Sequence, residues 1–251
     1  MAIQIPLKSP REIETLRKAG KILAGILTEL SCSLKSGMTT AQINAIAEQL
    51  MSAHHVKPAF KGYRGYPASV CISINQEVVH GIPGKRLIRS GDIVSLDAGI
   101  VYEGYFSDMA VTVGVGKLDP GKQKLLEVTQ TALQKGIDQA KVNQQLSDIS
   151  FAVQSWVESQ GFSVVRDFVG HGIGRALHEE PEIPNYGPPH CGPVLKTGMV
   201  FAIEPMVNMG SWETKILDDG WTVETLDGRP SAHFEHSIVI TAEGPEILTK
   251  Q

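Results

Sequence analysis

The chain has 251 residues, of which 42% are hydrophobic and 20% charged, and its formal net charge is −4. These values are typical of a globular protein with a full core, and the acidic balance gives no general attraction to nucleic acid. No apolar run reaches membrane-spanning length, residues 1–6 lack the pattern of a signal peptide, and three widely spaced cysteines favour a reducing, cytoplasmic compartment.

The first half of the chain opens with two predicted amphipathic helices. Residues 9–12 combine Ser at the N-cap with Glu at N3, which is a capping box, and apolar residues keep helical spacing from there to Leu30. A second capping box at residues 39–42 begins a helix that extends to Met51. We therefore expect two helices before the first strand.

Strands follow in the first half. Residues 56–71 are rich in Gly, Tyr and Pro, which indicates a loop leading into a strand at 70–74. Further strands are expected at 93–98 and 106–115, folded into a hairpin by a turn at 102–104.

The second half repeats this order. Helices are expected from Asp119 to Ala140 and from Leu146 to near Gly161. Strands are expected at 162–168, 199–206, 221–226 and 232–241, with a turn at 227–228. We expect the strands of both halves to form one curved antiparallel sheet with the helices outside and an acidic interior.

An internal duplication explains the repeated order. Residues 89–97 and 196–204 share one pattern: basic, hydroxyl, Gly, any, aliphatic, any, small, aliphatic, acid. The tripeptide His-Gly-Ile also occurs twice, at 80–82 and 171–173. We interpret the chain as a single catalytic domain, residues 1–251, built from pseudo-repeats of about 10–117 and 118–251.

Four acids in these strands predict a metal site. Asp97 and Asp108 should lie roughly opposite each other on one face of the first hairpin, and Glu204 and Glu235 are their counterparts in the second half. Neighbouring carboxylates repel, and two divalent cations would balance four negative charges. His171 adds an imidazole, and this donor set suits Mn, Fe, Co or Zn.

Other interpretations of these segments are weaker. A structural salt-bridge network would need Lys or Arg within the same strands, and these runs contain none. The glycine-rich loop at 169–174 does not have the spacing of a dinucleotide-binding fingerprint. The chain contains neither the HExxH zinc motif nor the GxSxG elbow of serine hydrolases.

Eight segments in order make the chain strongly resemble the type I methionine aminopeptidases of the short bacterial form. They are Gly62-Tyr63-Arg64-Gly65-Tyr66-Pro67, residues 70–75, His80-Gly81-Ile82-Pro83, residues 91–94, Gly170-His171-Gly172-Ile173-Gly174, His178-Glu179-Glu180-Pro181, Ile203-Glu204-Pro205 and residues 219–222. The resemblance implies the α/β pita-bread fold and removal of the initiator methionine from nascent chains when the next residue is small.

The resemblance also implies roles for individual residues. Asp97 would bind one metal ion, His171 and Glu204 the other, and Asp108 and Glu235 would bridge the two. Glu204 would also shuttle a proton, while His80 and His178 would bind the substrate backbone and the tetrahedral intermediate. The methionine side chain would lie against Tyr63, Tyr66, Cys71, Phe60 and Trp221.

Two departures and one further site accompany the resemblance. Phe60 and Leu177 stand where well-known members carry Cys and Phe, so the pocket wall is expected to differ. Asn75, Glu77 and Ser231 match a monovalent-cation site.

The implied setting is a cytoplasmic monomer that acts on nascent polypeptides, with the ribosome as a candidate partner and with no membrane and no specific nucleic acid as partner. Two alternatives stay open: an X-Pro aminopeptidase or dipeptidase of the same fold, and a non-catalytic binding relative.

Overall fold

The computed structural model describes residues 5–251. The expectation that residues 1–6 carry no signal peptide therefore falls mostly outside the described part of the chain. Within the described part, no helix combines the length and the apolar content that a membrane span requires.

Four α-helices lie within residues 5–251, and the first two begin at the predicted capping boxes. The Glu12 backbone N–H donates to the Ser9 hydroxyl while the Ser9 N–H donates to the Glu12 carboxylate, so the first capping box is complete. Thr39 and Gln42 form the second box. The helices are α1 (Pro10–Ser33), α2 (Thr40–Ala53), α3 (Pro120–Gln139) and α4 (Leu146–Ser159).

The strands of the described chain form one large sheet and two small ones. The nine-stranded sheet contains β1 (Lys57–Pro58), β2 (Cys71–Ile74), β4 (Ile93–Tyr102), β5 (Tyr105–Gly114), β7 (Gly170–Gly172), β8 (Glu179–Ile183), β9 (Val200–Ile203), β14 (Glu235–Thr241) and β15 (Gly244–Ile247). The small sheets contain β6 (Ser163–Val164), β10 (Met206–Asn208) and β13 (Ser231–His233), and β3 (Glu77–Val79), β11 (Thr214–Ile216) and β12 (Val223–Thr225). A 3-10 turn, η1 (Tyr63–Gly65), lies in the predicted loop before β2.

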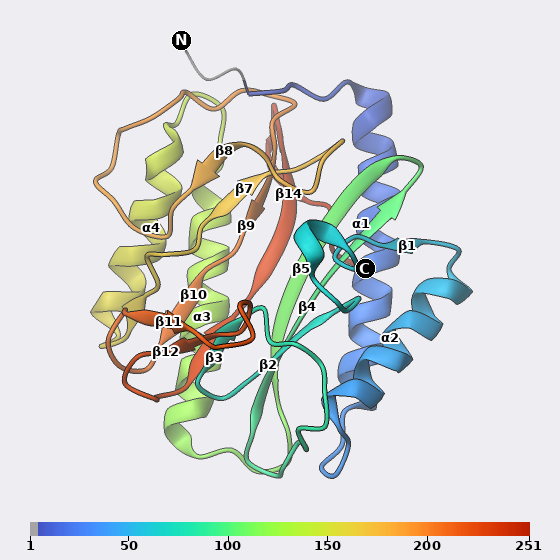
Figure 1. Ribbon diagram of the computed structural model, residues 1–251. Coiled ribbons are helices and arrows are strands. Elements are labelled where there is room, and N and C mark those ends of the chain that lie inside the picture. The colour runs from blue at the N-terminus through green and yellow to red at the C-terminus, as the bar shows by residue number, and fades with distance from the viewer. Residues whose placement is uncertain (1–4) are drawn as a thin grey trace.

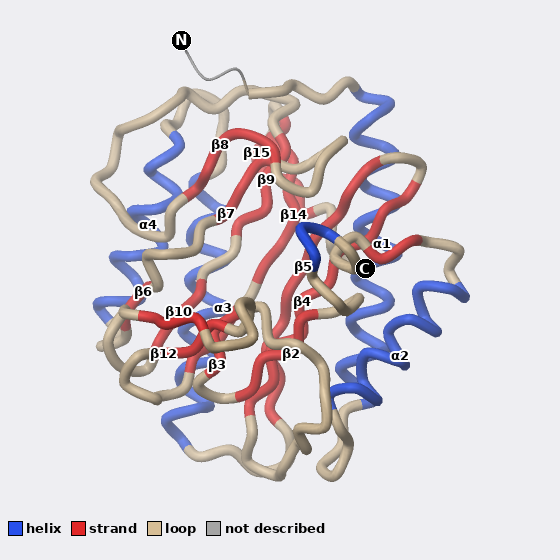
Figure 2. The backbone as a smooth tube through the Cα atoms, viewed as in Figure 1, coloured by secondary structure: helices blue, strands red, loops and turns tan. Residues whose placement is uncertain are grey.

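The large sheet joins the two halves of the chain. Seven of its strands follow the order β1-β4-β5-β14-β9-β7-β8, while β2 pairs with β4 and β15 with β14, and every pair is antiparallel. The halves meet between β5 and β14, where Glu235 faces Ala110. In Figure 2 the pair α3–α4 lies on the left and the pair α1–α2 on the right, and the strands pass in front of α1 and α3. The predicted curved antiparallel sheet with outer helices is confirmed.

Successive side chains of a strand point to opposite faces, which gives the sheet one apolar face, and the helices cover that face. In β4, Leu96, Ala98 and Ile100 are buried in the apolar cluster that also contains Leu23 and Leu27 of α1. Full burial of each leucine or isoleucine side chain contributes roughly 1.5–3 kcal/mol. A second cluster joins α3 and α4 to β9 and β14 in the same way. In Figure 1 helices α1 and α3 lie behind the sheet, so the alternate strand residues, Asp97 among them, point to the opposite face.

Several predicted strands are shorter or interrupted. The strand expected at 199–206 breaks after Ile203 into β9 and β10, which belong to different sheets, because Pro205 has no N–H to continue the ladder. The strand expected at 232–241 breaks at Phe234 into β13 and β14. Of residues 162–168 only β6 is strand, and of 221–226 only β12. Strands β1, β3, β7, β8, β11 and β15 were not expected; β1 and β7 lie in the segments 56–71 and 169–174 that were predicted as loops.

Candidate metal centre

Strand register places three of the predicted ligands on one face of the large sheet. Paired residues share a face, and so do residues two apart on a strand. Ala110 of β5 faces Asp97 on one side and Glu235 on the other, and Asp108 lies two positions from Ala110. The partner of Asp108 is Gly99, so Asp97 and Asp108 are diagonal neighbours, two positions apart, rather than direct opposites as expected. The turn at 103–104 sets this offset.

The second half brings His171 and Glu204 to the same face. His171 of β7 pairs with Ala202 of β9, and Glu204 lies two positions beyond Ala202. The β9–β14 register, continued by one residue, puts Glu204 opposite Glu235. Both glutamates lie where a strand leaves the large sheet, Glu204 just after β9 and Glu235 at the start of β14. The four acids and His171 therefore converge on the face opposite α1 and α3.

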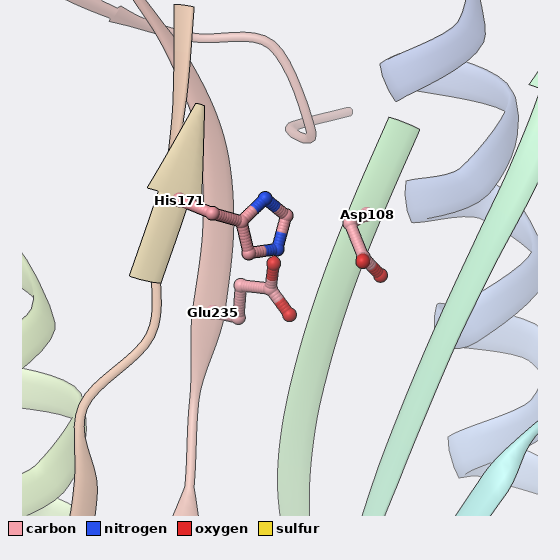
Figure 3. A group of neighbouring side chains, drawn as sticks. All are labelled: Asp108, His171 and Glu235. Carbon is pink, nitrogen blue, oxygen red and sulfur yellow. The ribbon is translucent and has the colours of Figure 1, made fainter. Parts of the chain in front are cut away.

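The side chains approach one another closely. Asp108, His171 and Glu235 each offer one ligand atom, and these atoms lie within 4.8 Å of one another (Figure 3). His171 Nε2 lies 3.5 Å from Glu204 Oε1. His171 Nδ1 lies 2.9 Å from the carbonyl oxygen of Gly172. Because a carbonyl only accepts, the ring proton belongs on Nδ1, and Nε2 keeps a lone pair directed at the acids.

Burial changes the charge that these groups carry. It raises the pKa of Asp108 to about 7. Burial, followed by repulsion from Asp108, raises the pKa values of Asp97, Glu204 and Glu235 well above their usual range. Burial also lowers the pKa of His171 to about 3, so its imidazole is neutral. The carboxyls cannot all ionise together at neutral pH unless a cation offsets their repulsion.

The donor set fits divalent cations. Asp97 Oδ1 and Glu235 Oε1 are buried without a hydrogen-bond partner among residues 5–251. No Lys or Arg of the described chain forms an ion pair with the four acids. Buried acceptors without donors are costly, and metal coordination removes that cost. Carboxylate oxygens with one imidazole suit Mn, Fe, Co or Zn, so the geometry favours a metal site over a salt-bridge network.

The histidines expected to contact substrate lie beside the acids. His178 Nδ1 is 2.7 Å from the Tyr63 hydroxyl, and its ring centroid is 4.3 Å from that of His171. The His80 ring packs edge-on against Phe168 at 5.5 Å. Burial lowers the pKa of His80 to about 4 and also lowers that of His178. Both imidazoles are therefore neutral at pH 7 and can donate or accept hydrogen bonds.

A cavity of about 360 Å³ joins the acids to an apolar wall. Tyr66 contacts Trp221 edge-on at 5.1 Å and donates its hydroxyl proton to the Gly81 carbonyl. Cys71 is buried and faces Asp97 across β2 and β4. All the residues that the resemblance assigns to the methionine pocket line this cavity, together with Leu177: Phe60, Tyr63, Tyr66, Cys71 and Trp221.

Phe60 fits because of a glycine in the neighbouring strand. A Cβ on Gly99 would lie 2.7 Å from Phe60 Cε1. Gly99 lies two positions from Asp97 on β4, so the phenyl ring fills the space beside this predicted ligand. Phe60 and Leu177 are both buried, with exposed fractions of 8% and 2%.

The residues expected to bind a monovalent cation are already hydrogen-bonded. Asn75 Oδ1 accepts from Lys122 Nζ, and the Asn75 carbonyl accepts from the Ser231 N–H. The Glu77 carboxylate accepts the Ile74 N–H and pairs with Arg86. A cation here would have to bind mainly through backbone oxygens, so this site stays a prediction.

The sequence motifs did not identify one buried histidine of the cavity. His233 lines the cavity and is 2% exposed, and its Nε2 lies 3.7 Å from Glu204 Oε2. Neither ring nitrogen has a hydrogen-bond partner within residues 5–251. Its position two residues before Glu235 could have placed it on the same face. Asp167, Phe168 and Glu182 also line the cavity, and no motif identified them. Arg64 lines it as well; it lies in a segment that carries the resemblance but was given no role.

Comparisons with known proteins agree with this site. The model of metallopeptidase family M24 matches residues 14–242. The methionine aminopeptidase of Clostridium perfringens is 53% identical, with 98% of each chain covered. Methionine aminopeptidase 1 of Bacillus subtilis is 51% identical, over 97% of this chain and 98% of its own.

Solved structures give the same result. The crystal structure of methionine aminopeptidase from Thermotoga maritima superposes with a TM-score of 0.97 at 48% identity, covering 99% of this chain and 100% of that one. The prolidase of Pyrococcus horikoshii shares the fold, with a TM-score of 0.80 at 24% identity, but only 63% of its chain is covered. The pita-bread fold and the predicted resemblance are confirmed. The chain belongs to metallopeptidase family M24 and, within it, to the methionine aminopeptidases.

Proposed function

We propose that this enzyme removes the N-terminal methionine from nascent proteins whose second residue is small, by dinuclear metal-assisted peptide hydrolysis. The observation that carries the proposal is the cavity in which the four acids and His171 meet an apolar wall. The acids supply metal ligands at one side, and the wall suits an unbranched thioether at the other. The names of the relatives support the same activity.

Two divalent ions would be held by five side chains, with Co, Mn, Fe or Zn as the metal. Asp97 would serve one ion, His171 and Glu204 the other, and Asp108 and Glu235 would be shared. When bound, such ions polarise a peptide carbonyl and lower the pKa of water. Two divalent ions also balance the charge of four ionised carboxylates, which burial otherwise opposes.

Glu204 would act as the general base and general acid of the reaction. Its carboxylate would take a proton from the attacking water and return it to the leaving amine. His178 would donate from Nε2 to the substrate carbonyl, because Tyr63 is positioned to donate its hydroxyl proton to Nδ1. The neutral state of His178 and of His80 leaves both free to hydrogen-bond the peptide backbone.

The methionine side chain would occupy the apolar wall formed by the residues around Phe60, Cys71 and Trp221. An unbranched chain of this length fits a wall of aromatic edges, and the sulfur makes favourable contacts with aromatic rings. One methylene changes binding by only ~1–3 kcal/mol, so norleucine should be tolerated. The limit on the second residue rests on the family alone.

Two other functions compete with this one. An X-Pro peptidase would use the same fold, but the prolidase likeness extends to the fold alone. A non-catalytic binding relative would not need to keep all five ligand side chains together in a cavity, yet this chain does. Both alternatives are less well supported than a methionine aminopeptidase.

Peptides that begin Met-Ala, Met-Lys and Ala-Pro, assayed with the same metal, separate these functions. We expect cleavage of Met-Ala and little cleavage of the other two. Preferential cleavage of Ala-Pro would assign the chain to the X-Pro peptidases, and equal cleavage of Met-Lys would remove the limit on the second residue. Absence of turnover with each of Co, Mn, Fe and Zn would favour the binding relative.

The proposed setting is a cytoplasmic monomer that meets nascent chains as they leave the ribosome. The limit to short second residues would let the enzyme select among new N-termini. Sedimentation of the protein alone tests the monomer. Co-sedimentation with translating ribosomes, at several salt concentrations, tests the encounter.

A further inference from the structure

A buried lysine from the start of the chain reaches the loop that carries His178. Lys8 is only 8% exposed, and its Nζ lies 2.5 Å from Glu179 Oε2. The Lys8 backbone N–H donates to the Gly198 carbonyl at 2.8 Å, which anchors this segment before α1 begins. A buried ammonium group is costly unless it is paired, so the lysine holds its position only while Glu179 is there.

Glu179 in turn organises the loop between β7 and β8, residues 173–178. Its second carboxylate oxygen, Oε1, accepts the backbone N–H groups of Arg175 and Ala176 at 2.7 and 3.2 Å. Gly174 lies so close to Lys8 that a Cβ there would be 2.4 Å from Lys8 Cε. The loop is therefore folded around the ion pair, and Lys8 contacts it with both its aliphatic stem and its charge.

This loop places two side chains in the cavity. Leu177 and His178 immediately precede Glu179, and both line the cavity. His178 lies next to the Tyr63 hydroxyl at 2.7 Å and the His171 ring at 4.3 Å. A small movement of the loop would therefore change the direction in which the His178 ring points. We propose that Lys8 is a positioning residue for His178, acting through Glu179. This inference rests on the proposed function.

A second ion pair reaches the same loop and supplies a matched control. Arg175 donates to Glu12 Oε1 at 3.2 Å, but the Arg175 side chain is 69% exposed. Exposed pairs contribute little because water screens them. The Lys8–Glu179 side chains are 5% and 12% exposed. If burial of the ion pair is what holds the loop, Lys8→Met should perturb His178 and Arg175→Gln should not.

The first measurement is a double-mutant cycle between Lys8 and His178. We expect Lys8→Met to lower kcat on a Met-Ala peptide by ~10-fold or more with little change in KM, because misplacing a transition-state group lowers kcat. In a His178→Ala background the same substitution should change kcat by less than about twofold. Metal content and KM serve as checks that the rest of the site is intact.

The second measurement does not depend on turnover. Hydrogen exchange at the Arg175 and Ala176 amides should accelerate in the Lys8→Met protein. In the Arg175→Gln protein, exchange at the Ala176 amide should stay unchanged. If Lys8→Met does not fold, Glu179→Gln replaces it, because the amide oxygen still accepts both N–H groups while the charge is lost. A wild type without activity would defeat the proposed function and leave this exchange test decisive.

Two results would overturn the inference. One is unchanged exchange at both amides in the Lys8→Met protein or its Glu179→Gln substitute. The other is an equal loss of kcat from Lys8→Met with and without His178, which would mean that Lys8 stabilises the fold in general.

Discussion

At the scale of single residues, Asp108 is the centre of the acidic group. Its charge contributes to the raised pKa values of Asp97, Glu204 and Glu235. Its backbone is fixed at the junction of the two halves, where the Ser237 hydroxyl donates to the Asp108 carbonyl at 2.8 Å. A side chain so placed can reach ions held by either half, whereas His80 lies against Phe168 at the cavity wall.

Asp108→Asn and His80→Ala should therefore lose activity for different reasons. We expect Asp108→Asn to lose metal as well as activity, because an amide oxygen carries no charge to offset a cation. His80→Ala should keep its metal and lose ~10²-fold or more in kcat, in line with loss of one positioned polar group. Elemental analysis beside steady-state kinetics checks both. Recovery of His80→Ala without metal would make His80 a ligand and refute its assignment to substrate.

At the scale of elements, α1 packs unusually close to the C-terminal end of the chain. A Cβ on Gly20 would lie 2.2 Å from the Leu248 carbonyl oxygen, whereas a Cβ on Gly25 would meet only the Gln251 side chain at 3.6 Å. Both glycines are inside the helix, where Ala is favoured by ~1 kcal/mol. The helix and the backbone after β15 touch only because Gly20 has no side chain.

Gly20→Ala and Gly25→Ala should thus change stability in opposite directions. The clash with rigid backbone at Gly20 should outweigh the gain in helix propensity, and we expect a net loss of ~1–3 kcal/mol. Gly25→Ala should gain ~0.5–1 kcal/mol. Urea unfolding of the metal-free proteins measures both. Stabilisation by Gly20→Ala would show that α1 can shift away from Leu248 at little cost.

The capping box of α1 predicts a pH dependence. Hydrogen bonds from the backbone and side chain of Ser9 lower the pKa of Glu12 from 4.5 to about 2. A carboxyl with a lowered folded-state pKa stabilises the fold above its unfolded pKa, and this contribution is lost as the pH falls from about 4.5 towards 2. Glu12→Gln should lower Tm at pH 7, and the difference from wild type should narrow between pH 5 and 3. A constant difference across that interval would assign the effect to packing.

At the scale of the molecule, the predicted ligands come from both halves. Asp97 and Asp108 belong to β4 and β5, His171 belongs to β7, Glu204 follows directly after β9, and Glu235 begins β14. Only the β5–β14 ladder connects these groups within the sheet order. Metal bound by all five would tie the halves together across that ladder.

Metal should therefore raise the unfolding temperature. An ion that binds the folded state alone stabilises it by ~2.7 kcal/mol at a free concentration of 100 times Kd. We expect calorimetry to show an increase in Tm with Mn or Co that a chelator reverses, together with loss of activity. Asp108→Asn is the control that should show little shift. An unchanged Tm in the wild type, with metal in excess, would contradict the assigned centre.

The sequence by itself determined the helices, the acids and their face. Caps such as Ser9–Glu12 and Thr39–Gln42 act over three residues, so they can be identified without knowing the fold. The alternation of Leu96, Asp97 and Ala98 likewise places the acid opposite the helices, because side-chain direction follows from strand geometry alone. The resemblance to the methionine aminopeptidases depended on short motifs of the same local kind. The duplication stays a prediction.

Only the tertiary structure decided the breaks, the register and the long-range contacts. Glu204 lies at a break between two sheets, and the pairing of β5 with β14 joins segments more than a hundred residues apart in the chain. The Lys8–Glu179 pair spans 171 positions, and neither residue belongs to a metal-site pattern. Such features depend on which distant parts of the chain pack against one another and exclude water from their contact. Burial of this kind is a property of the packed chain, whereas caps and alternation are properties of neighbouring residues.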